Sequence, residues 1–265
     1  MSLIKKYRFQ FFKYAVYTAL FFNVIFFFQE EMAASAHRFA EGFTLFEFIE
    51  AFTSTIDTAA WVVLLLLFEL ETYIIEDDKL KGGLLWFFHI IRAFCYCFVV
   101  YSFWGYLNNY LWVLEFEPIA NLSLCEFVDQ SLMITVDEFV QISAENCAEF
   151  SETELFQHTD KNIYTTLEHH QATTKLALVD ILNSAVWILV VIVLEVDVWL
   201  QLNNRFEGRV VTISKYIKNV LYAMLLLAAI YWGISGEFLD FWDAFLWIIA
   251  FVFIEMNLFE WREKE

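Results

Sequence analysis

Long apolar stretches, each about the length of a membrane crossing, alternate with shorter polar segments along this chain of 265 residues. About 20 apolar residues in a helix cross the hydrocarbon core of a bilayer, because an α-helix rises about 1.5 Å per residue. One Pro and seven Gly in the whole chain favour long continuous helices. The pattern predicts an all-α membrane protein with six transmembrane helices, at about 8–29, 54–75, 84–110, 176–202, 210–233 and 237–259.

A polar pattern recurs in the second, fourth and sixth of these stretches. Each copy has Asp or Asn, then Trp four residues later, Glu eight residues after the Trp, and an acid or amide two residues further on. The equal spacing in all three copies indicates internal repetition. The copies are Asp57, Trp61, Glu69 and Glu71; Asn183, Trp187, Glu195 and Asp197; and Asp243, Trp247, Glu255 and Asn257.

The first, third and fifth stretches share a weaker pattern, in which a basic residue is followed by Tyr four residues later. Its basic residues are Lys13, Arg92 and Lys218. The repeating unit is therefore a hairpin, with a basic helix going out and an acidic helix coming back. Three such hairpins predict an approximately threefold arrangement about an axis along the membrane normal. This plan resembles that of the mitochondrial carriers in outline, but their Pro-x-Asp/Glu-x-x-Lys/Arg motif has no counterpart here, so we transfer no carrier function or residue.

Basic residues fall mainly on one side of the predicted spans. With the N-terminus in the cytoplasm and six crossings, 13 of the 16 Lys and Arg residues lie in or near cytoplasmic segments, as the positive-inside rule requires. The first apolar run is too long for a signal-peptide core and lacks a small-residue cleavage site. We expect an integral protein of a bacterial inner membrane, with both termini in the cytoplasm.

The net charge of −18 is concentrated between the two groups of spans. We expect residues 1–111 to hold the first three helices, residues 112–175 to form an acidic extracytoplasmic helical cap, and residues 176–265 to hold the last three helices. Possible capping boxes at Thr135-x-x-Glu138 and Ser151-x-x-Glu154, with an apolar stripe from Leu132 to Ala144, predict short amphipathic helices in the cap. Cys125 and Cys147 lie in this segment, and outside the cytoplasm we expect them to form a disulfide.

The intramembrane charges allow two interpretations. Carboxylates are costly in hydrocarbon, and the Glu residues of the three copies reach the depth of the three basic residues. They can form structural ion pairs that hold the hairpins in register. Alternatively, the surplus of acids can line a polar layer that passes cations or protons. The Trp residues lie one turn from the outer Asp or Asn, where an interfacial aromatic belt is the expected role.

The leading functional hypothesis from the sequence is therefore a membrane transport or channel component. The alternative is a non-catalytic structural or accessory subunit of a larger membrane complex. A sensor of external cations is a weaker third hypothesis, since the short cytoplasmic loops offer little output surface. No zinc-protease, serine-hydrolase, Walker A or dinucleotide-binding motif occurs, so we expect no catalytic residue, metal or cofactor. The expected partners are lipid, cations or protons, and other membrane subunits or further copies of the chain. The acidic charge argues against nucleic acid.

Overall fold

The computed structural model is mostly helical and divides into two units. A helical unit comprises residues 1–103 and 185–265, and a sheet unit comprises residues 104–184. The structure describes residues 3–35, 48, 51–75, 82–119, 122–128, 131–136, 138–148, 154–159, 161–203 and 205–262.

Each of the six apolar stretches forms a helix. The helices are α1 (Leu3–Ser35), α3 (Thr53–Glu69), α4 (Gly83–Val113), α6 (Leu167–Leu202), α7 (Arg209–Ser235) and α8 (Phe238–Arg262). A π-helical turn, η1 (Leu70–Ile74), continues α3. Gly236 ends α7 in the left-handed conformation, at φ 99°, and α8 begins two residues later.

Within the described residues, four helices are long and apolar enough to cross a membrane. These segments are Phe9–Ala33, Gly83–Val113, Leu167–Asp197 and Arg209–Ser235. Many large apolar side chains on them point away from the protein, including Phe11 and Trp86. Such faces are normal where lipid is the solvent, since lipid tails are as apolar as the side chains themselves.

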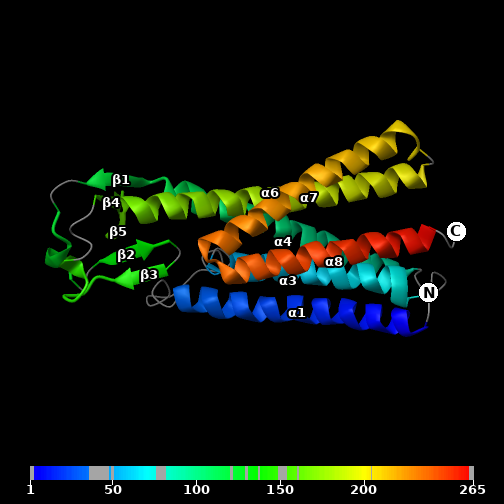
Figure 1. Ribbon diagram of the computed structural model, residues 1–265, viewed down its shortest axis with the longest axis horizontal. Helices are drawn as coiled ribbons and strands as arrows, with labels where there is room; N and C mark the ends of the chain where they lie inside the picture. The colour runs from blue at the N-terminus through cyan, green and yellow to red at the C-terminus, as the bar shows by residue number, and fades with distance from the viewer. Residues whose placement is uncertain are drawn as a thin grey trace. The chain divides into compact units, whose positions relative to one another are not determined.

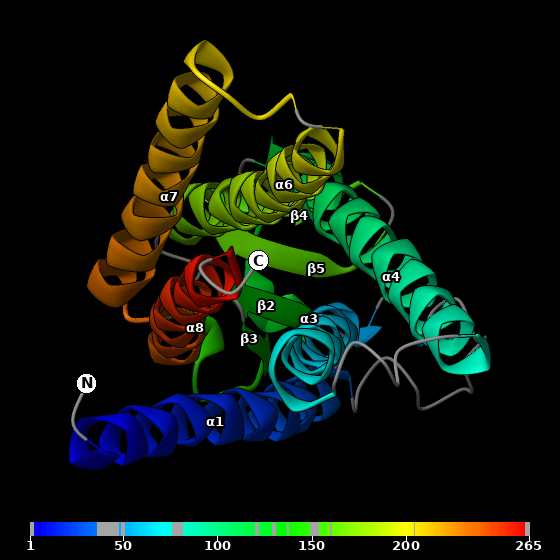
Figure 2. The same cartoon turned by 90° about the vertical axis from the view of Figure 1, so that its right-hand side faces the viewer.

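The helical unit is held together by one apolar core. In it, α1 packs against α3 and α8, and α7 packs against α8 (Figure 2). The buried members of this core include Leu20, Leu65, Val190, Leu225 and Ala250, which come from five different helices.

The sheet unit corrects the prediction of a helical cap, because its central element is a five-stranded sheet (Figure 1). The strands lie in the order β1-β4-β5-β2-β3, and among the described strand pairs only β2–β5 is parallel. Pro118 lies in β1, an edge strand, where a missing N–H is tolerated. The strands are β1 (Phe116–Ile119), β2 (Leu132–Thr135), β3 (Glu138–Gln141), β4 (Leu155–His158) and β5 (Ile163–Thr166).

The apolar stripe that suggests a helix belongs instead to a β-hairpin. Leu132 lies in β2, Phe139 and Val140 lie in β3, and Val136 lies in the turn between them. Val136 adopts a positive φ of 55°, which is strained for a β-branched residue. Its carbonyl accepts a hydrogen bond from the Thr173 hydroxyl at 2.7 Å. The proposed capping box at Thr135 is therefore wrong, and the one at Ser151 lies outside the described residues.

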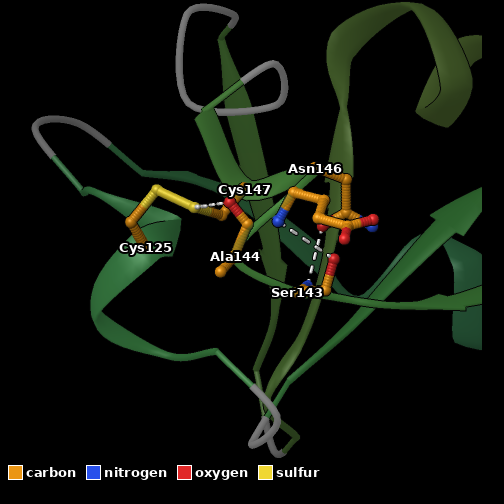
Figure 3. Close-up of a disulfide and its surroundings, with 6 residues drawn as sticks. Cys125, Ser143, Ala144, Asn146 and Cys147 are labelled. Atoms are coloured by element: carbon orange, nitrogen blue, oxygen red, sulfur yellow. Dashed lines mark hydrogen bonds between the residues drawn. A yellow bond between two sulfur atoms is a disulfide. The ribbon is translucent and has the colours of Figure 1, made fainter.

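The disulfide between Cys125 and Cys147 is present, as the sequence predicts (Figure 3). Cys147 packs in a small core with Leu124 and Met133. Just before it, the Asn146 side chain accepts a hydrogen bond from the Ser143 amide and donates one to the Gln141 carbonyl. The disulfide and this turn together link the end of β3 to the segment before β2.

Candidate functional site

The inner charge layer, which we define as the acids at the ends of α3 and α6 and their partners, centres on a buried ion pair. The Lys13 ammonium on α1 lies 2.5 Å from the Glu69 carboxylate at the end of α3. Their side chains are 1% and 3% exposed. Glu69 also accepts hydrogen bonds from the hydroxyls of Tyr14 and Tyr17, at 3.2 and 3.4 Å. The carboxylate thus has a cation and two hydroxyl donors, all from α1.

Two further acids of this layer also contact basic residues. Arg92 of α4 forms an ion pair with Glu71 in η1. Lys218 of α7 lies 3.2 Å from a carboxylate oxygen of Asp197, and the Ser214 hydroxyl donates to the same oxygen at 2.6 Å. Asp197 is buried, at 5% exposed, so Lys218 neutralises its negative charge inside the protein.

Glu195 differs from the other acids of the layer. It is exposed on α6, and the contact that it makes is a hydrogen bond from the Tyr96 hydroxyl at 2.8 Å. Glu195 is the sequence equivalent of Glu69, and Tyr96 is the equivalent of Tyr17. The two Glu–Tyr contacts therefore repeat, whereas the buried cation beside Glu69 has no described counterpart beside Glu195.

The two acids in each of the first two copies contact different helices. Glu69 faces α1 and Glu71 faces α4; Glu195 faces α4 and Asp197 faces α7. In these two copies the first acid therefore contacts the helix before it in the chain, and the second contacts the helix after it. Side chains two apart project to nearly opposite sides of a helix, which is the physical reason for this division. In the third copy, α8 covers positions 255 and 257, but the side chains of Glu255 and Asn257 lie outside the described part.

The three Trp residues of the repeat meet one another inside the helical unit. The ring centroids of Trp61, Trp187 and Trp247 are 5.9, 6.3 and 6.4 Å apart in pairs. Each side chain is buried, at 5 to 9% exposed. They do not form the expected aromatic belt at the membrane surface. They join α3, α6 and α8 instead, and we call them the Trp cluster.

The Asp and Asn residues that begin the three copies of the repeat lie next to this cluster, and we call them the outer polar groups after their predicted position. Asp57 and Asp243 each accept a hydrogen bond from the indole one turn later in their own helix, Trp61 and Trp247 respectively. The two carboxyl groups are also close enough to repel each other electrostatically. Asn183 occupies the same position in the repeat, and its carbonyl oxygen is buried and has no hydrogen-bond partner among the described residues.

Asn23 joins this group, although it is not part of the repeated pattern. It is fully buried in α1, and its amide donates to Asp243 of α8 at 2.8 Å. The signal that could have found it is an Asn inside an apolar run, ten residues after Lys13. Ser102, ten residues after Arg92, is likewise buried, and its hydroxyl has no hydrogen-bond partner in the described part of the chain.

Two histidines of the sheet unit pack against aromatic rings. His158 stacks on Trp112, with ring centroids 4.9 Å apart, and its Nε2 lies 3.3 Å from Glu115. His170 stacks on Phe156 at 4.9 Å. Among the described residues, no group of three or more His, Cys, Asp and Glu side chains could hold a metal ion.

The comparisons with known proteins give no relative from which a function could be transferred. No protein-family model matches the sequence, and no curated protein or solved structure matches it either. The function must therefore be argued from the geometry of the chain.

Proposed function

We propose that this protein is a non-catalytic structural or accessory subunit of a larger membrane complex. The observation that supports this most directly is the pairing of the inner charge layer. Glu69, Glu71 and Asp197 each contact a cation on a neighbouring helix. Paired and hydrogen-bonded charges are the form in which a folded protein tolerates buried acids, and such pairs fix the register of the helices.

The proposal includes the full six-span topology. In it, α3 with η1 and then α8 cross the bilayer as well as the four helices already identified, and the three hairpins surround a common axis. Two features support this arrangement: the meeting of the three Trp residues, and the recurring contacts of the acids with the preceding and following helices. The same proposal places both termini in the cytoplasm of a bacterial cell, and the Cys125–Cys147 disulfide supports an outer location for the sheet unit.

The Trp cluster argues against a continuous path along such an axis. Three large rings in mutual contact fill the space between α3, α6 and α8 at one level. A water-filled path for ions needs polar groups at every level that it crosses. The exposed apolar faces of α4 and α7 are instead suited to lipid or to partner helices, including those of further copies.

Reconstitution into vesicles tests this proposal. We expect purified wild-type protein to give proton, sodium and potassium fluxes no larger than those of protein-free vesicles. Glu69→Gln should lower the stability of the protein without changing these fluxes. A saturable wild-type flux that Glu69→Gln abolishes, in protein that remains folded, would overturn the proposal.

One observation favours cation or proton transport as a second candidate function. Glu195 is exposed, and its described contact is with a neutral phenol rather than a base. An acid of this kind can exchange a proton or a cation at a lower cost than a buried ion pair. If flux is found, Glu195→Gln should reduce it more than a change at Glu71, which is already paired with Arg92.

A further inference from the structure

We propose that Asn23, Asp57 and Asp243 form a binding site for a hard divalent cation, with Ca²⁺ as its simplest representative. This inference goes beyond the proposed structural role. The site uses Asn23 of α1 with the outer polar groups of α3 and α8, and none of the residues of the inner charge layer.

The first argument is an unmet hydrogen-bonding capacity. Asn23 is 0% exposed, and its amide nitrogen contacts Asp243. This contact places the carboxamide group at the carboxyl pair. The carbonyl oxygen of Asn23 and one carboxyl oxygen of Asp57 are both shielded from solvent, and neither has a hydrogen-bond partner among the described residues. Buried polar oxygens without a partner are uncommon, because each costs about 1–3 kcal/mol.

The second argument is that no described cation lies beside the two acids. Asp57 and Asp243 are close enough to interact electrostatically, and neither forms an ion pair with any base that the structure describes. The nearest cation along α1 is Lys13, which lies ten residues or about 15 Å from Asn23 and is already paired with Glu69. The third nearby acid, Glu31, is satisfied differently. It accepts hydrogen bonds from the amides of Ser54 and Thr55 at the start of α3.

The donor set then selects the ligand. Two carboxylates and one amide carbonyl are all oxygen donors, which hard cations such as Ca²⁺ prefer over softer metals. A divalent ion neutralises both carboxylates at once, whereas a monovalent ion leaves one charge uncompensated in a buried place. The Trp61 and Trp247 indoles hold the two carboxyl groups in position, so they are positioning residues rather than ligands.

Calcium titration by calorimetry, on the full-length protein in detergent after chelator treatment, tests the site. We expect wild-type protein to show a saturable binding event. Asp57→Asn and Asp243→Asn should each weaken it about tenfold or more. Glu207→Gln is the control, since it removes an exposed acid between α6 and α7, outside the site, and should leave the affinity unchanged. Calcium bound weakly by the acidic sheet unit would persist in all of these variants and so can be subtracted.

A gain-of-function variant keeps the test informative even if the Asp→Asn variants fail to fold. Asn23→Asp places a third carboxyl group beside Asp243. If the site binds a cation, this variant should bind calcium more tightly, and calcium should raise its thermal stability more than that of the wild type. The proposal is overturned if wild-type binding is absent or survives Asp57→Asn, or if Asn23→Asp is destabilised with no rescue by calcium. A proton shared between the two carboxyl groups would then explain their burial.

Discussion

The Lys13–Glu69 pair is the most deeply buried charge contact described in the helical unit, and its energetics set it apart from surface ion pairs. Both side chains are almost fully buried, so each would carry a large desolvation cost without the other. Arg92 and Glu71 are 26% and 16% exposed, and that pair is partly screened by its surroundings. The two ion pairs should therefore differ in how much stability the protein loses when one partner is replaced.

We expect Glu69→Gln to destabilise the protein by about 3–5 kcal/mol, because Lys13 is left buried and uncompensated. The double variant K13M/E69L should recover most of this loss, since it removes both charges and keeps the volume filled. Unfolding in SDS, followed by circular dichroism, measures both effects. Glu195→Gln serves as the control and should change stability much less, because Glu195 is exposed. Equal effects at the two glutamates would contradict the assignment of Glu69 as a buried ionic anchor.

A substitution at Val136 should raise the stability of the protein, in contrast to Glu69→Gln. Its positive φ costs a β-branched residue about 1–2 kcal/mol, and glycine adopts this conformation freely. Val136→Gly should therefore stabilise the sheet unit by about 0.5–1 kcal/mol after the greater chain entropy of glycine is counted. Val140→Gly, four residues later in β3, should destabilise it instead. Thermal unfolding of the full-length protein compares the two, and a loss of stability in both variants would contradict the strain argument.

At the scale of elements, the Trp cluster is the contact that joins α3, α6 and α8. Trp61→Ala should cost about 3–5 kcal/mol, because it opens a cavity against two other rings. Trp86→Ala removes the same side chain from a position that is 69% exposed on α4 and should cost far less. Unfolding in SDS again provides the measurement. A small effect at Trp61 would mean that the three helices are held together elsewhere.

The disulfide gives the sheet unit a covalent link between two segments 22 residues apart. Replacing both cysteines with serine should lower the stability of this unit by about 3 kcal/mol, since the reduced chain has more conformational freedom when unfolded. The control is Cys97→Ser, which removes an exposed free thiol. Thiol labelling of the unfolded, unreduced protein should modify two of the four cysteines. Labelling of all four would show that the bond does not form.

The helices were predictable from the sequence, and the sheet was not, for physical reasons. A 20-residue apolar run has few alternatives to a helix, because its backbone must satisfy its own hydrogen bonds in lipid. The strands are only four residues long, and β2 and β3 each hold adjacent apolar residues, so neither shows the alternation of a half-buried strand. Leu132, Val136 and Phe139 happen to be spaced as on one face of a helix. The sequence gives no signal for the turn at Val136, because valine rarely adopts the left-handed conformation.

At the scale of the whole chain, the repeat predicted how its paired polar positions are divided between helices, but not which residues they contact. It singled out two polar positions in each copy, and their spacing indicated that they face different sides of the helix. It could not show that Glu71 would contact the next hairpin's Arg92, because that depends on how the hairpins pack. Asn23 could not be recognised from the repeat, because it has no polar counterpart in the fifth helix, where Ala228 occupies the corresponding position.

The bond between Asn23 and Asp243 has a consequence for biosynthesis. It joins the first helix to the last across 220 positions in the chain. At about 5–20 residues per second, the ribosome needs roughly 10–45 s to make the second partner after the first. During that interval the amide of Asn23 has entered the bilayer without the acid that it will bind. The nascent protein should therefore remain open, and depend on the insertion machinery, until its final helix arrives.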